Sequence, residues 1–380
     1  MSTSIQDVLS SSAWEDVLAW LPPDLDALAE RTGGFQRRRA IRSPEDFIRM
    51  ALAYGVMDLS LRSVAAWCAT QGLGELSNVA VLGRLRRGWP LLEATLQSML
   101  SRSLVAPPVG GLRRRVRLVD ATTVSAPGSD GADWRLHVGF DVAAGVVDAV
   151  TLTDGRGGEH LGRFSAERGD LLVADRGYAH EDRLWSVVEG GVDVLVRIGH
   201  SAVPLVNNEG AAVDPMKFAT RRRSRAGRPP RAEGCVVFLR RDTARSRPLR
   251  LIVVRKSAAA ADKERDRILR EAKKRGKVPS ERTLRATKFA FLLTSVPARD
   301  ASDATMAELY RVRWQIELTF KRWKSLLHLA DLRADDPDLA RAYIYAKLIA
   351  AVLADTMARQ WRAFSPYGLP VGYRALARVA

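Results

Sequence analysis

The chain has 380 residues, of which 47% are hydrophobic, which is enough material for two or three packed domains. It contains no run of about 18 apolar residues and does not begin like a signal peptide, so we expect a soluble cytoplasmic protein with no membrane partner. Its two cysteines, Cys68 and Cys235, are far apart and exclude a disulfide framework or a zinc ribbon.

Positive charge is concentrated in one segment of the chain. The formal net charge is +17, and residues 201–290 hold 25 Lys and Arg against 9 Asp and Glu, which gives this segment +16. Such a balance favours a polyanionic partner, most commonly nucleic acid, although a solvated surface or a disordered tail would look similar. Apolar runs at Cys235–Leu239 and Leu249–Val254 interrupt the charges and favour a folded element.

The first hundred residues predict helices. Ser43, followed by Pro44 and two acids, is a strong helix start, and Ser60 opens a second helix that reaches Thr70. Ser77 is suited to cap a third helix, Asn78–Arg87. This third helix would carry Arg84, Arg86 and Arg87. Two short helices around a glycine turn resemble a helix-turn-helix, but purely structural bundles contain the same pattern.

From residue 113 the pattern changes to alternating strands and helices. The expected strands are Arg115–Val124, Trp134–Val142, Val146–Thr153, Asp170–Ala174 and Val192–Ile198, and the expected helices are Glu159–Arg168 and His180–Gly190. Three strands followed by helix, strand, helix and strand is the ribonuclease-H-like order, so the expected fold class is α/β.

The basic segment comes next and predicts a β-rich insertion. Besides its two strand-like runs it contains an expected helix, Ala259–Arg275, and a last apolar run, Phe289–Ser295. Two further helices, Asp303–His328 and Leu339–Trp361, are expected to complete the fold.

Two carboxylates stand at the ends of buried strands. Asp120 ends the run Val116–Val119, and Asp175 ends the run Leu171–Ala174. A carboxylate in this position is held rigidly, and two of them on neighbouring strands repel unless a cation lies between them. Hard cations such as Mg²⁺ or Mn²⁺ fit this demand. Taken alone, each aspartate is more readily explained as a turn or helix cap than as a metal ligand.

The helix Asp303–His328 supplies a third acid. Its side chains at positions 310, 313, 317, 321 and 324 occupy one stripe roughly 80° wide, beside an apolar stripe. The members of the polar stripe are Tyr310, Arg313, Glu317, Lys321 and Lys324. An ordinary amphipathic helix with surface salt bridges would show the same spacing.

Together these motifs resemble the DDE transposases of the insertion-sequence 4 group. The matching residues are Asp120-Ala121-Thr122, Asp175-Arg176-Gly177-Tyr178 and the signature formed by Tyr310, Arg313, Glu317 and Lys324. Further similarity lies in Trp134–His137, Thr151–Gly155 and Gly157–Glu159. The resemblance covers residues 113–329 firmly and the N-terminal helices loosely.

The resemblance implies a ribonuclease-H-like core in which Asp120, Asp175 and Glu317 hold two Mg²⁺ or Mn²⁺ ions for DNA cleavage and strand transfer. It implies a helical DNA-binding domain (residues 1–110), a core in two parts (111–199 and 297–332), the basic insertion (200–296) and a C-terminal helical region (333–380). The expected partners are double-stranded DNA, as terminal inverted repeats and target, and a second copy of the chain on paired ends, in the nucleoid. Expected DNA contacts are Tyr310, Arg313, Lys321, Lys324, Arg176, Arg84, Arg86, Arg87, Arg221, Arg222 and Arg223.

The sequence departs from the group at one point. Well-known relatives use a tryptophan of the insertion to hold a flipped base, but no tryptophan lies between Trp185 and Trp314. Phe218, Phe238, Phe289 or Phe291 are the candidates to replace it by stacking. His137 is expected to be structural, because phosphoryl transfer by two metals needs no general base.

Two other functions fit parts of this pattern. A metal-dependent nuclease on the same fold would cut DNA without joining strands. A domesticated DNA-binding protein would keep the fold without catalysis, but it would have no reason to retain all three acids together with Tyr310, Arg313 and Lys324.

Overall fold

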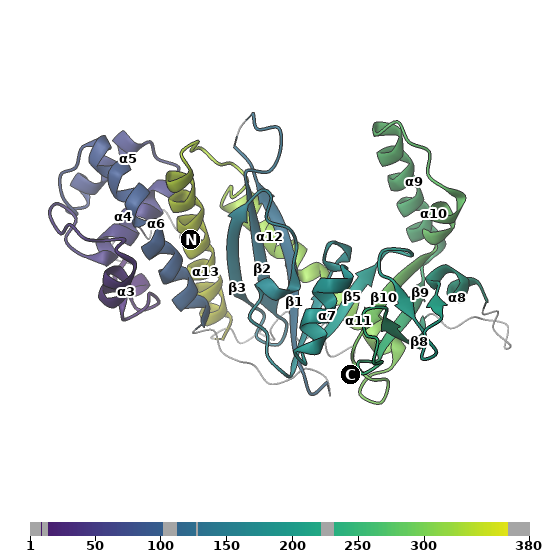
Figure 1. Cartoon of the computed structure of the whole chain (residues 1–380). Coiled ribbons are helices and arrows are strands. Elements are labelled where there is room, and N and C mark those ends of the chain that lie inside the picture. Colours follow the sequence, from purple (N-terminus) through teal and green to yellow (C-terminus); the bar gives the residue numbers. More distant parts are fainter. Residues whose placement is uncertain (1–8, 10–13, 102–111, 127, 222–231, 364–380) are drawn as a thin grey trace.

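The computed structural model describes residues 9, 14–101, 112–126, 128–221 and 232–363, with the backbone alone at residues 221 and 360–363. A bundle of helices stands at one end, a large mixed sheet runs through the middle, and a helical arm projects at the other end (Figure 1). The expected α/β class is confirmed at this level.

The N-terminal bundle is built by the helix starts that the sequence contains. The hydroxyl oxygens of Ser43, Ser60 and Ser77 accept hydrogen bonds from the backbone N–H groups of Asp46, Ser63 and Ala80 at 3.1, 3.1 and 3.2 Å. The bundle consists of α2 (Trp14–Leu18), α3 (Leu25–Thr32), α4 (Pro44–Val56), α5 (Leu61–Thr70) and α6 (Asn78–Ser101), and α13 (Pro337–Ala363) packs against α4 and α6.

The expected end of the third helix at Arg87 is wrong, because α6 continues to Ser101 through Pro90. Gly88 is buried, and its missing side chain leaves room for the ring of Phe47 from α4. Burial of Leu91, Leu92 and the following apolar residues stabilises the second half of the helix despite the proline. A helix of this length is a packed bundle element rather than a short recognition helix.

The strands form one sheet in the order β3-β2-β1-β4-β5-β10-β9-β8-β6-β7. In β1, β4 and β5 the strands run parallel to one another, whereas β2, β3 and β10 pair antiparallel with their neighbours. The five expected core strands are confirmed as β1 (Arg115–Val124), β2 (Trp134–Asp141), β3 (Val146–Asp154), β4 (Asp170–Ala174) and β5 (Asp193–Ile198).

The basic segment extends this sheet instead of forming a separate one. β10 pairs with β5 and with β9, so the insertion continues from the core strand by strand. Its elements are β6 (Leu205–Val206), β7 (Ala212–Val213), α8 (Pro215–Arg221), β8 (Ala232–Leu239), β9 (Leu249–Arg255), α9 (Ala258–Lys274), α10 (Glu281–Ala286) and β10 (Phe289–Thr294).

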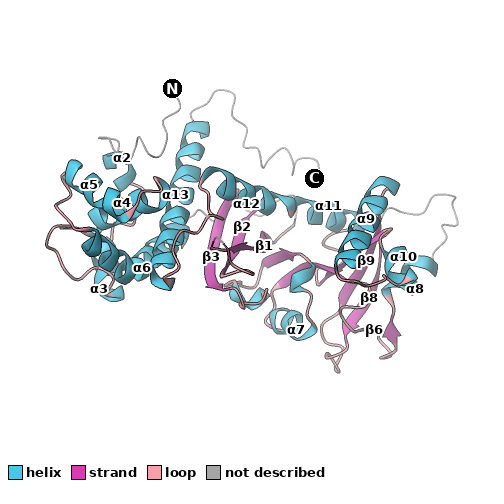
Figure 2. Ribbon diagram, turned by 90° about the horizontal axis from the view of Figure 1, so that it is seen from above, coloured by secondary structure: helices cyan, strands magenta, loops and turns pink. Residues whose placement is uncertain are grey.

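Helices cover the two faces of the sheet (Figure 2). α7 (Glu181–Glu189) packs with Val119, Leu172 and Ala174 on one face. On the other face, α11 (Asp303–Val312) and α12 (Trp314–Leu326) pack with Leu118 and Val173. This alternation along β1 and β4 places the side chains of residues 120 and 175 on the α11–α12 face.

Two helix predictions are wrong. Instead of a helix at Glu159–Arg168 there is a single 3₁₀ turn, Leu161–Arg163. A second 3₁₀ turn, Arg176–Tyr178, follows β4. Instead of one helix over Asp303–His328, α11 and α12 meet at Arg313, where the bonds run from Arg313 N–H to Tyr310 C=O and from Ile316 N–H to Arg313 C=O. These three-residue steps interrupt the regular α-helical hydrogen bonding next to the sheet.

Among the described residues, no helix is both long and apolar enough to cross a membrane.

Candidate active site

The two predicted aspartates are neighbours in the sheet, but the expectation that both stand at strand ends is wrong for Asp120, because β1 continues past it to Val124 in pairing with β2. β1 and β4 are parallel with Val119 opposite Ala174, so Asp120 and Asp175 follow in register at adjacent strand positions. Parallel strands lie about 4.8 Å apart, and both side chains point to the α11–α12 face. The sheet register therefore places these two acids side by side.

The helix pair brings three residues of the predicted stripe to the same place. The Tyr310 hydroxyl donates to Asp175 Oδ1 at 3.2 Å. Arg313 donates from Nη1 to Asp120 Oδ2 at 3.1 Å and from Nη2 to Glu317 Oε1 at 2.5 Å. One guanidinium thus joins the first acid to the third, and the break in the helix at Arg313 lies directly over the aspartates.

The two aspartates have opposite pKa shifts. Burial raises the pKa of Asp120 to about 6, and the carboxylates of Asp175 and Glu159 add to the rise, whereas the Ala121 N–H and Arg313 oppose it. Burial also acts to raise the pKa of Asp175, but the Arg176 N–H, Arg313, Arg197 and Tyr310 outweigh it and lower this pKa below its ordinary value. The pair therefore favours one negative charge more readily than two.

The third acid stands further out. The Glu317 side chain is 47% exposed, and no group of three His, Cys, Asp or Glu side chains within the described ranges is arranged to hold a metal ion. Because a single guanidinium contacts both groups, the bonded oxygens of Asp120 and Glu317 lie within roughly 8 Å of each other. The acids are thus drawn together by Arg313 rather than by direct contact.

The other predicted phosphate contacts are exposed near this centre. Lys321 and Lys324 lie one and two turns beyond Glu317 on α12. Lys321 and Arg176 are exposed, and Lys324 is half-buried. The Arg176 backbone N–H donates to Asp175 Oδ1. Of the predicted DNA contacts, Arg222 and Arg223 and the side chain of Arg221 lie outside the described residues.

A second cluster lies behind the aspartates and was missed by sequence reasoning as a unit. A Cβ atom on Gly177 would meet Glu159 Oε2 at 1.5 Å, so the glutamate occupies the space that this glycine leaves open. The Glu159 carboxylate also lies 3.9 Å from the Arg135 guanidinium. After burial, its charge contributes to the raised pKa of Asp120 and of the buried Tyr178. In the sequence, only the two separate motifs Gly158-Glu159 and Asp175-Arg176-Gly177 pointed to this cluster.

His137 belongs to the buried part of this region. It is fully buried, its Nε2 lies 3.1 Å from Thr153 Oγ1, and burial together with Arg163 and Arg135 lowers its pKa to about 4. A neutral, enclosed imidazole agrees with the structural role expected for it.

An exposed tryptophan next to the site was also missed. Trp314 follows Arg313, is 53% exposed, and lines a hollow of about 520 Å³ with Tyr310, Arg311 and Arg313. A large apolar residue on the polar side of an amphipathic helix was the signal in the sequence. In contrast, Phe238, Phe289 and Phe291 are buried, so the expectation that one of them stacks on a base is wrong for these three.

The three arginines of α6 do not form a free basic face. Arg84 lies over the Phe35 ring and donates to the Arg37 carbonyl, and Arg86 pairs with Asp336 at 3.1 Å, while Arg87 is exposed. Intramolecular contacts therefore hold two of the three.

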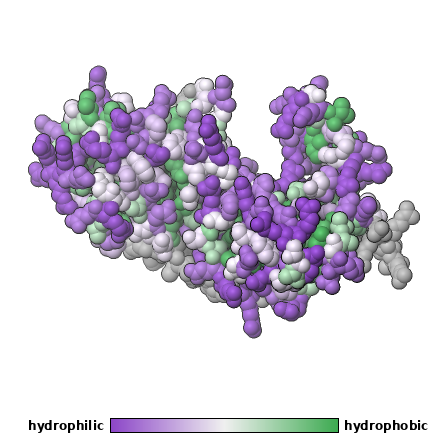
Figure 3. Space-filling view, viewed as in Figure 1, coloured by the Kyte–Doolittle hydropathy of each residue, from purple (hydrophilic) through white to green (hydrophobic). Residues whose placement is uncertain are grey.

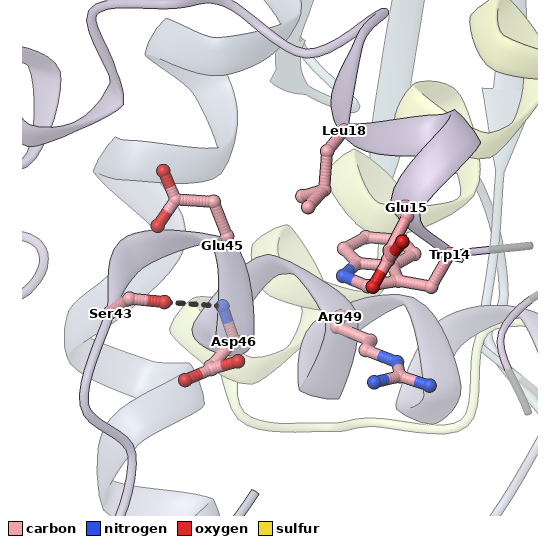
Figure 4. Close-up of a pocket in the computed structure, with 7 residues that line it drawn as sticks. All are labelled: Trp14, Glu15, Leu18, Ser43, Glu45, Asp46 and Arg49. Atoms are coloured by element: carbon pink, nitrogen blue, oxygen red, sulfur yellow. Dashed lines mark hydrogen bonds between the residues drawn. The ribbon is translucent and has the colours of Figure 1, made fainter. Parts of the chain in front are cut away.

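A hollow of about 440 Å³ between α2 and α4 is acidic (Figure 4). Glu15, Glu45 and Asp46 line it, and its cation, Arg49, donates to the Leu9 carbonyl and to Gln71. This part of the bundle is poorly suited to bind phosphate.

Comparisons with known proteins decide the family. Residues 111–353 match the model of the transposase DDE domain. The chain belongs to the DDE transposase family. It is 37% identical over 365 residues to the putative transposase InsL for insertion sequence element IS186A of Escherichia coli (strain K12), covering 94% of this chain and 97% of that protein.

Two further relatives support the same family. The transposase for insertion sequence element IS421 of Escherichia coli is 37% identical over 366 residues, with 94% of this chain and 97% of the relative covered. The transposase for insertion sequence element IS231E of Bacillus thuringiensis subsp. finitimus is 23% identical over 272 residues, with 64% and 56% covered. This chain is thus a DNA transposase, an enzyme that transfers polynucleotide strands, and its partner is DNA.

Proposed function

We propose that this transposase is a cut-and-paste enzyme of the insertion-sequence 4 group with a ribonuclease-H-like core. The order β3-β2-β1-β4-β5, with parallel β1, β4 and β5, supports this core. The core would consist of residues 111–199 and 297–332, and the insertion of residues 200–296. The helical regions at the two ends would be residues 1–110 and 333–380.

The donor set fits a divalent metal. Asp120, Asp175 and Glu317 offer carboxylate oxygens alone, which suits Mg²⁺ or Mn²⁺. Burial raises the pKa of Asp120, with a further contribution from Asp175 and Glu159, and a bound cation would offset this rise. We propose two ions per site, held by these three side chains. Divalent ions in such a site activate the attacking hydroxyl group and stabilise the leaving oxygen.

The remaining side chains would bind and orient the DNA. Arg313 spans Asp120 and Glu317, so a phosphate bound beside these acids lies within its reach. Tyr310 is fixed by Asp175, and Lys321 and Lys324 continue the same side of α12. These four side chains would hold the backbone in line for attack, and Trp314 offers an exposed ring on which a base can stack.

The substrate would be the terminal inverted repeats of its own element, brought together by two copies of the protein at the nucleoid. Arg87 and residues 221–223 remain proposed DNA contacts. Arg84 and Arg86 would have to exchange their intramolecular partners to serve in this way.

The observation that carries the proposal is the bridge from Asp120 through Arg313 to Glu317 across the two parts of the core. Asp120→Asn, Asp175→Asn and Glu317→Gln should each abolish cleavage of DNA from the flanks of the coding region in Mg²⁺, while binding of this DNA persists. Glu308→Gln, on the neighbouring helix, is the matched control and should cut normally. Strand transfer by any of the three variants would refute the assignment.

Joining distinguishes a transposase from a nuclease of the same fold. Incubation of flanking DNA with a target plasmid should give joined products for the unmodified protein. Cleavage without any joined product would favour the nuclease.

A further inference from the structure

One helix of the insertion is almost without a partner. Within α9, which has 17 residues, Ala261 is the sole buried residue, and Figures 1 and 3 show the helix projecting from the sheet as an arm. A hollow with mainly hydrophilic walls separates this arm from the rest of the molecule (Figure 3). An isolated helix of this length is marginal in water, so its projection indicates a surface that a partner covers.

The base of the arm is anchored next to the active site. Glu264 lies 3.8 Å from Arg197 of β5, and Arg197 follows Val196, which is paired with Ala174, so Arg197 lies beside Asp175 in the sheet. Alternation along β5 puts Arg197 on the same sheet face as Leu195 and the aspartates. The arm therefore rises from the face on which the DNA is cut.

Two of the four acids of α9, Glu264 and Glu271, are already neutralised, whereas Asp262 and Asp266 are exposed. Arg267 donates to Glu264 at 2.7 Å and to Glu271 at 2.6 Å, so one arginine bridges both glutamates along the helix. It keeps these two carboxylates from opposing a polyanion.

Three cations on the same side of α9 as Arg267 take no part in its bridge to the glutamates. Lys263, Arg270 and Lys274 are exposed, and none of them has an acidic partner in the part of the chain that the structure describes. At 100° per residue they fall within a band about 40° wide, centred beside Arg267. We call these three residues the basic ridge.

We propose that the basic ridge of α9 grips the phosphate backbone of the DNA duplex beside the cleaved bond. This inference rests on the proposed function. Phosphates are the partner that matches a row of unpaired cations, and a helix of 17 residues is roughly 25 Å long, enough to follow about seven base pairs. The arm would therefore position DNA near the site without reading its sequence.

A matched pair of double variants tests the proposal. R270Q/K274Q removes two charges from the ridge, and R265Q/K273Q removes the same two kinds of charge from exposed positions of α9 outside it. The full-length proteins are titrated with a linear duplex from the flanks of the coding region at several salt concentrations. Each lost phosphate contact lowers the salt slope by about 0.9. Between 50 and 200 mM salt, the factor by which DNA affinity falls should therefore be about tenfold smaller for R270Q/K274Q than for the unmodified protein.

The other measurements separate the alternatives. The footprint of R270Q/K274Q should lack protection within roughly seven base pairs of the nick, whereas R265Q/K273Q should keep this protection and cut at the normal rate. Equal salt slopes for both double variants would overturn the proposal. A change in oligomeric state without a change in slope would also overturn it and assign the arm to a second copy of the chain. Failure of the unmodified protein to cut would count against the proposed function instead.

Discussion

A buried ion pair joins the N-terminal bundle to the end of the catalytic helix. Lys347 of α13 is 1% exposed, its Nζ lies 3.5 Å from Asp58 Oδ1, and it donates to the His328 carbonyl at 3.0 Å. Tyr343 donates to the same Asp58 oxygen at 2.6 Å. Asp58 and His328 both have positive φ angles, of 53° and 48°, so the pair holds two unfavourable backbone positions in place.

Removal of one partner should be costly. Asp58→Asn keeps a residue that tolerates positive φ but leaves the buried ammonium group of Lys347 without its counter-charge, which costs about 3 to 5 kcal/mol. Lys347→Met fills a similar volume without charge and should lose less. In the double variant no unpaired charge remains inside, so its free energy of unfolding should recover by at least about 2 kcal/mol relative to Asp58→Asn.

Urea unfolding of the four proteins, followed by tryptophan fluorescence, measures this coupling. If the losses of the two single variants add up in the double variant to within about 0.5 kcal/mol, the two side chains do not act as a pair. Glu93→Gln, whose carboxylate accepts from Tyr345 elsewhere on α13, provides a comparison for loss of an ordinary partner.

The same pair has a defined pH dependence. Burial lowers the pKa of Lys347 below 10.5, and Asp58 opposes this effect. Between the lowered pKa and 10.5 the unfolded chain binds more protons than the folded one, so stability from this group rises as the pH rises through that window. Lys347→Met should lack this rise.

Two glycine contacts give further predictions. Gly88→Ala places a Cβ 2.1 Å from the Phe47 ring and should destabilise the bundle by about 1 to 3 kcal/mol in thermal unfolding, whereas Gly83→Ala on the same helix meets only the mobile end of Arg87 and should stabilise it slightly. Gly177→Ala should leave the melting temperature nearly unchanged, because the end of the Glu159 side chain can move, but it should slow DNA cleavage. Combining it with Glu159→Ala should add no further loss of cleavage; an additive loss would separate the two residues.

The core strands were predictable because each is an apolar run between turn residues. Residues 116–119 and 171–174 are buried on both faces of the sheet, so their continuous apolar runs predicted strands without any knowledge of the partner strand. The position of Asp175 at the end of β4 followed from the same runs, whereas β1 continues past Asp120 to Val124. In contrast, the pairing of β10 with β5, which makes the insertion part of the core sheet, depends on contacts between residues that lie 93 to 99 positions apart in the sequence.

The wrong helix predictions have local causes that only tertiary contacts resolve. Glycines at 157, 158 and 162 weaken a helix after Glu159, and His160 instead accepts from the Gly162 N–H through Nδ1 to close a single turn. Gly88 and Pro90 weaken α6 in the same way, yet that helix continues because Phe47 and α13 pack against it. Propensity was even more unfavourable in α6, because an interior proline costs about 3 kcal/mol and a glycine about 1 kcal/mol, so packing decided between the two segments.

The break at Arg313 joins the fold to the chemistry. Periodicity alone predicted one straight helix, in which Tyr310, Arg313 and Glu317 share a stripe, but a straight stripe does not explain how two residues reach different aspartates. With the three-residue steps at the junction, Tyr310 contacts Asp175 from α11 while Arg313 contacts Asp120 and Glu317. Burial leaves the carboxylates of Asp120 and Asp175 poorly solvated, and together with Tyr310 they raise the pKa of Arg313. The electrostatics of these two aspartates therefore explain why the junction between α11 and α12 is held beside them, and sequence spacing contains no information about that attraction.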